Sequence, residues 1–299
     1  MGRTFGAGSV AALICLCGLL PLPADAHGFA GKRFFPATLS IDDPAVGPEV
    51  DILFGHTKAP NDDGTSTNAN TTELEFSQLI TRRFGLSIGT EYDNFLPAGE
   101  KPQRGFNNLE IGAKYLALVN ARHEAMVSFG LDAEFGGTGA RAVSDSFSTI
   151  SPTVFFGKGF GDLPESFKYL RPVAITGAIA PNFTTSAAEP DSLDWGFTFQ
   201  YNLQYLQSFV KDVGLSAPFD HVIPIVETPM STCLGQGCGG QTTGTINPGL
   251  IWFGRYGQIG LEATIPVNQR SGNHVGVLVQ LHLYLDDLFP HSLGKPLFQ

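Results

Sequence analysis

The stretch "VGVLVQLHLYL", Val275 to Leu285, shows the alternation that decides the fold. Aliphatic residues occupy every second position, and the intervening positions hold Gly276, Leu278, Gln280, His282 and Tyr284. A helix would scatter the aliphatic residues around its circumference, whereas a strand places them on one face. The length matches the roughly nine to eleven tilted residues that cross a bilayer and exceeds the roughly five or six of an average soluble strand. The stretch therefore predicts a membrane-spanning strand.

The same alternation recurs along the chain between polar links. We expect about twelve strands, at 49–58, 72–80, 86–95, 107–118, 124–135, 147–157, 171–183, 194–206, 221–228, 244–254, 257–266 and 275–285. Long links at 59–71, 96–106, 136–146, 184–193, 229–243 and 267–273 alternate with short ones near 81–84, 119–123 and 254–256, although 158–170 and 207–220 are long as well. Outer-membrane barrels show this asymmetry between their two ends. The sequence predicts an all-β, transmembrane, antiparallel up-and-down β-barrel of about 12 strands.

The first residues indicate export. Arg3, the apolar run "VAALICLCGLLPL" and the small residues "PADA" are typical of a signal peptide, here residues 1–26, which is removed from the mature protein. The mature chain then divides into a segment at 27–48, a barrel at 49–285 and a periplasmic tail at 286–299. The segment at 27–48 does not alternate and is rich in phenylalanine. We expect it to dock inside the barrel as a plug or against its periplasmic mouth.

The mature chain keeps two cysteines, Cys233 and Cys238, in a glycine-rich stretch. In an exported protein we expect them to form a disulfide. The alternative, a metal site, lacks further ligands nearby for four-coordinate zinc. Cleavage would make His27 the amino terminus, and its amine and imidazole are a weak candidate pair for chelating copper. We expect no cofactor.

Composition restricts the partners. The chain is 42% hydrophobic and 11% aromatic, with 36 glycines, only 18 Lys plus Arg and a net charge of −10. This profile fits a membrane barrel, and its negative charge argues against nucleic acid, which proteins bind first through cationic side chains. The expected partners are the lipid bilayer of the outer membrane, small solutes and, during insertion, the barrel-assembly machinery.

Alternation also selects the side chains that face the lumen. The candidates are Glu75, Glu91, Glu110, Lys114, Asp132, Glu134, Gln200, Glu262 and His282. Acidic residues outnumber Lys114, so an open lumen would prefer cations or neutral solutes. Alternatively, the carboxylates pair with Arg104 and Arg141 and brace a closed barrel. Twelve strands lie between the small barrels filled by side chains and the wide porins.

Other function classes remain as alternatives to a channel. A lipid hydrolase in the barrel wall would need a histidine beside a nucleophilic serine, and no histidine stands in such a local motif. A structural or adhesive barrel is a further class, and a soluble periplasmic two-sheet binding protein is another. The soluble protein would be released from cells without detergent. We expect a channel or transporter and no enzyme.

Three short stretches carry a resemblance to a known family. "NLEIGAKYLAL" (108–118), "FGLDAEF" (129–135) and "HLYLDDLFP" (282–290) resemble outer-membrane proteins described as transporters of the meta-cleavage pathway of phenol degradation. The resemblance implies a barrel of this size and passage of small aromatic molecules. This chain departs from the usual aromatic last residue of such barrels, since "DDLFPHSLGKPLFQ" continues beyond the last expected strand.

Overall fold

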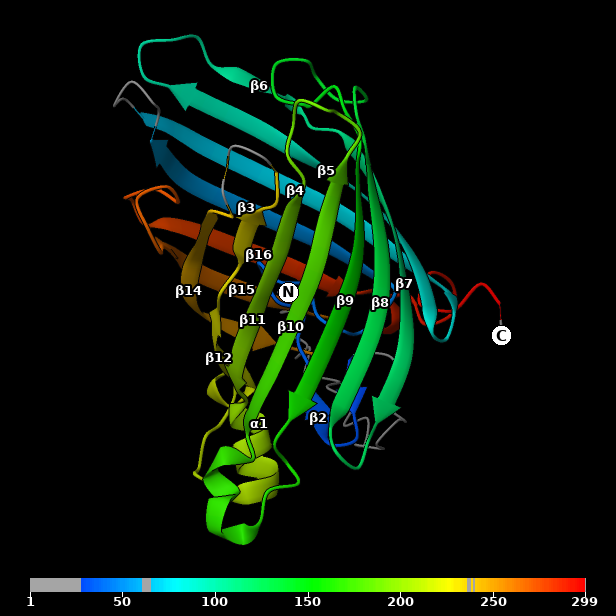
Figure 1. The fold of residues 1–299 in the computed structure, drawn as a ribbon. Coiled ribbons are helices and arrows are strands. Elements are labelled where there is room, and N and C mark those ends of the chain that lie inside the picture. Colours follow the sequence, from blue (N-terminus) through cyan, green and yellow to red (C-terminus); the bar gives the residue numbers. More distant parts are fainter. Residues whose placement is uncertain (1–27, 61–65, 236–237, 239, 299) are drawn as a thin grey trace, which may run out of the picture.

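The strands close into a single barrel. The computed structural model describes residues 28–60, 66–235, 238 and 240–298. Twelve antiparallel strands form a ring, because neighbours in the chain pair with one another and the last strand pairs with the first (Figure 1). They are β3 (Glu49–Pro60), β4 (Ser66–Thr81), β5 (Phe84–Pro97), β7 (Leu109–Asn120), β8 (Ala125–Phe135), β9 (Thr149–Gly159), β10 (Val173–Thr184), β11 (Ser192–Tyr201), β12 with β13 (Val222–Glu227 and Met230–Cys233), β14 (Thr242–Phe253), β15 (Gly257–Pro266) and β16 (Gly276–Tyr284).

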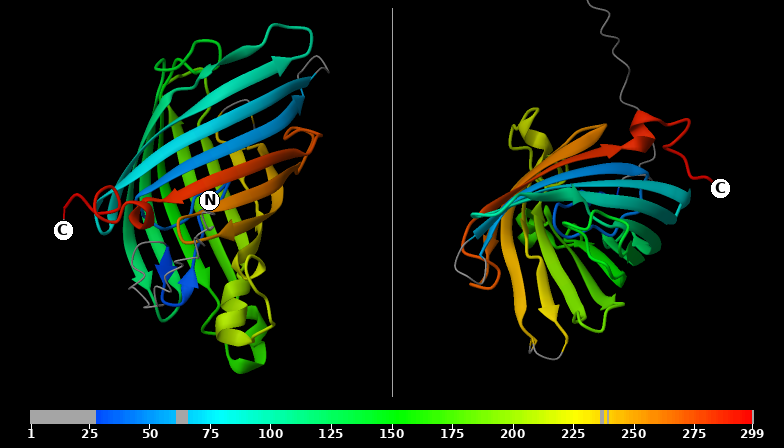
Figure 2. Two further views of the ribbon diagram at one scale, coloured as in Figure 1. Left: turned by 180° about the vertical axis from the view of Figure 1, so that it is seen from behind. Right: turned by 90° about the horizontal axis from the view of Figure 1, so that it is seen from above.

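The predicted fold class is confirmed. β12 and β13 count as one wall strand because both pair with β11 on one side and β14 on the other. The strands are tilted against the long direction of the molecule, as the rear and upper views show (Figure 2). One closed ring leaves no room for the alternative of two packed sheets.

Short elements join or line the wall. Within the described residues they are β1 (Phe29–Ala30), β2 (Arg33–Phe34), β6 (Gln103–Phe106), η1 (Glu165–Leu170), α1 (Leu203–Tyr205), η2 (Leu206–Val210), η3 (Phe219–His221) and α2 (Leu285–Leu288). No helix in the described part of the chain is long and apolar enough to span a membrane. The expected signal peptide and the candidate His27 lie outside the described residues.

Most expected strand boundaries differ from the structure by one or two residues, and three differences concern particular links or side chains. The wall strand expected at 72–80 begins at Ser66, so the expected link at 59–71 is mostly strand. The strand expected at 194–206 ends at Tyr201, because the Asn202 side chain accepts a hydrogen bond from the Tyr205 backbone N–H (2.8 Å) and starts α1. Leu285, expected to end the last strand, is buried at the start of α2.

The two faces of the wall differ as the alternation predicts. Large apolar side chains on the outward face are half exposed, for example Phe129 (53%), Leu250 (52%) and Leu261 (53%). Inward positions on the same strands hold polar residues such as Ser128 and Glu262, which are buried. Soluble monomers rarely expose so continuous an apolar surface, whereas a bilayer covers it.

Residues 28–48, called the luminal segment below, lie inside the barrel. β1 and β2 pair as a small hairpin at its start. Phe34 and Leu39 pack against Ile223, Ile251 and other inward apolar side chains of β12 and β14. The tail after α2 does not enter the lumen with the luminal segment. The backbone N–H groups of Leu297 and Phe298 donate to carbonyl oxygens at the end of β4.

Candidate functional site

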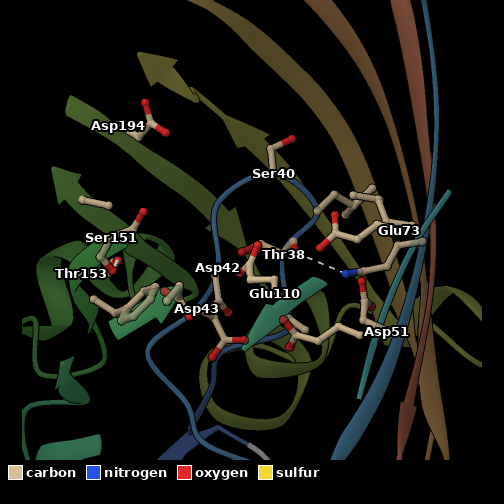
Figure 3. A pocket seen from close by; sticks show the side chains of 18 of the residues that line it. Thr38, Ser40, Asp42, Asp43, Asp51, Glu73, Glu110, Ser151, Thr153 and Asp194 are labelled. Carbon is tan, nitrogen blue, oxygen red and sulfur yellow. Dashed lines mark hydrogen bonds between the residues drawn. The ribbon is translucent and has the colours of Figure 1, made fainter. Parts of the chain in front are cut away.

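A cavity of about 430 Å³ lies in the lumen above the luminal segment. The segment forms its floor through Thr38 and Ser40, and the wall strands form its sides (Figure 3). Ten carboxylates line it: Asp42, Asp43, Glu49, Asp51, Glu73, Glu75, Glu110, Asp132, Glu134 and Asp194. Its described lining includes no lysine or arginine. The field in such an enclosed space attracts cations and repels anions.

Five of the predicted luminal residues line this cavity. They are Glu75, Glu110, Asp132, Glu134 and His282. Glu91 faces Glu73 across the β4–β5 pair but lies outside the lining. Arg104 and Arg141 are exposed and also lie outside it, so the structure does not place them against these carboxylates.

Glu262 and Gln200 are not on the open surface of the cavity, although the alternation placed them there. Both point inward, but the luminal segment and neighbouring side chains cover them, leaving 1% and 4% of their surfaces exposed. Glu262 accepts a hydrogen bond from the Ser40 hydroxyl (3.3 Å), and Gln200 donates to Thr176 (3.3 Å). Alternation gives the direction of a side chain and not what covers it.

Lys114 binds the luminal segment. Its ammonium lies 2.5 Å from the Asp42 carboxylate and 3.2 Å from the Asp43 carbonyl oxygen. It also lies over the Phe155 ring, 4.5 Å from the centroid. Lys114, Asp42 and Phe155 border a small pocket of about 40 Å³ that extends from the acidic cavity toward Gly85 at the start of β5. Lys114 therefore stands at a constriction and fixes the segment there.

Asp43 lies on the luminal segment and is 5% exposed. Its carboxylate accepts a hydrogen bond from the Ala45 backbone N–H (2.6 Å). Burial raises the pKa of the Asp43 carboxyl to about 7, and the negative charges of Asp42 and Glu49 act in the same direction, while Lys114 opposes them. The docked segment therefore carries an acid that holds its proton far above the usual pH range.

His282 is part of the wall and lies between two carboxylates. Its Nδ1 lies 3.0 Å from Asp51 and its Nε2 lies 3.1 Å from Glu49, so both ring nitrogens contact carboxylates. Elsewhere in the described chain, His56, His123 and His221 contact Asn70, Asp162 and Asp220, respectively. A serine hydrolase would need one such nitrogen beside a serine hydroxyl.

Glu227 is the main polar anchor of the luminal segment. One oxygen accepts from the backbone N–H groups of Leu39 (2.9 Å) and Ser40 (2.8 Å). The other accepts from the Ile41 N–H (3.2 Å) and the Thr198 hydroxyl (2.9 Å). All four contacts need an acceptor, so a fully buried carboxylate satisfies three backbone donors of the segment at once.

A second anchor holds the start of the segment. The guanidinium of Arg33, 0% exposed, donates to Glu124 (3.1 Å) and to the Pro172 carbonyl oxygen (2.9 Å) and stacks 4.0 Å from the Tyr205 ring centroid. The Tyr205 hydroxyl donates to the other Glu124 oxygen (2.8 Å). Burial raises the pKa of this hydroxyl, which therefore stays a donor. The ion pair with Glu124, the hydrogen bond to Pro172 and the stacking on Tyr205 join the segment to the links after β7, β9 and β11, respectively.

Sequence reasoning missed the surface on which the segment docks. Ile223, Ile225, Ile251 and Phe253 point inward and are buried, although a barrel lumen is usually polar. The stretches "HVIPIV" and "GLIWFG" have apolar residues on both faces, and that is the signal that something apolar covers the inner face.

Two further features concern bonds and metals. Cys233 and Cys238 form a disulfide between β13 and the link to β14. The described residues contain no group of three or more histidine, cysteine or acidic side chains arranged to hold a metal ion.

Comparisons with known proteins place the fold. No family model matches this chain, and no curated protein matches it. Among solved structures, a COG4313 outer membrane channel from Pseudomonas putida F1 is 10% identical, covers 84% of this chain and 99% of its own, and has a TM-score of 0.55. The KdgM porin (13% identity, 79% and 98% coverage, TM-score 0.48) and the NanC porin (9%, 79% and 98%, 0.49) are more distant in shape. At such identities a likeness shows the fold alone. The chain has the fold of an outer-membrane β-barrel.

Proposed function

We propose that this protein is an outer-membrane channel through which small cationic or neutral solutes diffuse, with the luminal segment as a partial plug. The cavity lined by ten carboxylates carries the proposal. An acidic, enclosed passage raises the local concentration of cations and excludes anions without any chemical step. The resemblance to phenol-pathway transporters supports small aromatic molecules among the solutes.

The proposed path follows the hollows of the lumen. A solute enters the acidic cavity, passes beside Asp42 and leaves through the pocket at Lys114 and Phe155. That pocket is about 40 Å³, enough for about one water molecule, so it limits the flow. Movement of Lys114 away from Asp42 widens it. The protein acts as a passive channel and not as an enzyme.

The proposal includes location and assembly. The half-exposed apolar outward face fits the lipid bilayer of the outer membrane. Export by the signal peptide at 1–26 and insertion by the barrel-assembly machinery complete this assignment. The side that holds the start of β3 and the end of β16, with most of the shorter turns, then faces the periplasm.

Single-channel recording tests the proposal. The mature protein is refolded in detergent and inserted into a planar bilayer, and the reversal potential is measured in a KCl gradient. We expect discrete steps with cation preference that weakens in Glu110→Gln and Asp132→Asn. The matched control is Glu100→Gln, an exposed turn residue outside the lumen, which keeps the preference. Anion preference, or a preference indifferent to Glu110 and Asp132, contradicts an acid-lined pore.

A further inference from the structure

A second hollow lies inside the barrel, across the luminal segment from the acidic strands. It measures about 350 Å³ and is bounded by β10, β11, β13 and β14. In the ring these strands stand opposite β3, β4 and β7, which carry five of the ten carboxylates. Figure 3 shows Asp194 on one side, Glu73 and Asp51 on the other, and Ser40 between them.

The walls of this second hollow are mostly small or apolar. They include Ile41 of the segment, Ala178 and Ala180 of β10, and Gly196 of β11. A Cβ atom at Gly196 would lie 2.5 Å from the end of the Ile41 side chain and 2.7 Å from the Thr228 carbonyl oxygen, so a larger residue there would displace the segment or the wall. The lumen of a barrel that passes only ions is usually polar throughout. Pockets that bind small molecules are mostly apolar and contain a few polar groups, as this hollow does.

The two hollows are neighbours and share part of their lining. Ser40, Ala180 and Asp194 border both. A molecule that occupies both therefore meets carboxylates at one end and hydrocarbon at the other. Neither an inorganic cation nor an apolar neutral molecule contacts both surfaces favourably.

We propose that the lumen binds an amphiphilic organic cation, a primary ammonium with a compact hydrocarbon body, across these two hollows. This proposal rests on the proposed channel function and names its solute class. The ammonium lies near Asp194 and the acidic cavity, and the hydrocarbon lies against Ala178, Ala180 and Ile41. Removing hydrocarbon from water adds affinity that a small ammonium ion lacks, and the carboxylates reject the corresponding anion.

Calorimetric titration of the refolded mature protein in detergent tests the proposal with four probes. They are cyclohexylammonium, methylammonium, cyclohexanecarboxylate and cyclohexanol, which separate the ring from its charge. We expect cyclohexylammonium to bind at least about tenfold more tightly than each of the others. Methylammonium lacks the ring, of which each buried CH₂ group contributes ~0.8 kcal/mol, and the other two probes lack the positive charge. Titration into detergent alone corrects for uptake by micelles.

Two matched variants locate the binding. Ala178→Leu fills the apolar hollow and is expected to remove most of the preference for cyclohexylammonium over methylammonium. Ala133→Leu makes the same change in β8, on the face shared with the exposed Phe129 and Leu131, and is expected to keep the preference. If Ala178→Leu keeps it as well, the ring binds elsewhere and the proposal is overturned.

The outcomes for the solute class and for the channel are distinguishable. Equal affinity for cyclohexylammonium and methylammonium overturns the solute class, even if KCl currents show a cation-selective pore. Preferential binding in a protein without currents supports the class and contradicts the channel. Tighter binding of cyclohexanecarboxylate overturns the charge assignment.

Discussion

Glu227→Gln is the most specific test of how the luminal segment is held. The two side chains have nearly the same shape, but an amide offers one acceptor oxygen and one NH₂ donor. Glu227 uses both oxygens as acceptors, for Leu39 and Ser40 on one side and for Ile41 with Thr198 on the other. The Thr198 hydroxyl can rotate, whereas the backbone N–H groups cannot. Either orientation of the amide therefore leaves at least one buried backbone donor facing another donor.

The cost follows from these contacts. An unsatisfied buried donor costs ~1–3 kcal/mol, and each of two remaining bonds loses about 1 kcal/mol when its acceptor becomes neutral. The sum is roughly 3–5 kcal/mol against docking of the segment, which corresponds to about a hundredfold or more in its opening equilibrium, at 1.4 kcal/mol per factor of ten. Thr198→Val removes a single contact, so it should cost about 1 kcal/mol.

Hydrogen exchange followed by mass spectrometry measures this opening. Peptides that cover 34–43 should exchange about a hundredfold faster in Glu227→Gln, while wall peptides from β7 and β8 keep their rates. Glu100→Gln, at an exposed turn, is the control and should change neither. Unchanged exchange at 34–43 would refute the assignment of Glu227 as an anchor, and equal acceleration in the wall would show that the barrel itself is destabilised.

Three further predictions concern other contacts of the segment. Arg33→Met leaves the buried Glu124 without its cationic partner and should destabilise the fold by ~3–5 kcal/mol, measured by urea unfolding in detergent. A stability within about 1 kcal/mol of the parent contradicts this. Lys114→Gln breaks the contact with Asp42 beside the pocket of about 40 Å³, which holds about one water molecule and limits the flow. Single-channel conductance should therefore rise about twofold or more. Reduced conductance argues against a constriction at this pocket. The pKa of Asp43 is raised from 3.8 to about 7, so its contribution to docking is complete below pH 3.8 and is lost as the pH rises through 7. Hydrogen exchange at 34–43, corrected for intrinsic rates, should therefore increase from pH 5 to 8 in the parent and should increase less in Asp43→Asn. An equal increase in both proteins contradicts the role of Asp43.

The wall could be predicted from the sequence because a spanning strand has a simple period. Lipid on one side and lumen on the other impose alternation. The sequence therefore predicts that Leu281 faces the lipid and that His282 faces the lumen. The expected strand at 257–266 agrees with β15 to the residue. Boundaries were less certain where a local hydrogen bond ends a strand, as Asn202 does.

The interior of the barrel could be predicted only in part. Alternation identifies Glu110 and Asp132 as inward, but it gives no sign that Asp42 and Asp43 complete the same acidic cavity. The luminal segment has no period, and its partners are set by the closed barrel and not by nearby sequence. For the same reason the inward Ile223 has no explanation until Leu39 is seen beside it.

The contacts of the luminal segment also bear on the order of folding. Its polar contacts reach from Lys114, which lies 72 residues after Asp42, to Gln280, which lies 242 residues after Thr38. Such separations make docking slow, because the intervening chain must first be brought together. The surface that receives the segment comes from both halves of the chain and exists only when most of the wall has formed. The luminal segment therefore precedes the whole wall in the chain, but it is among the last parts to reach its native contacts.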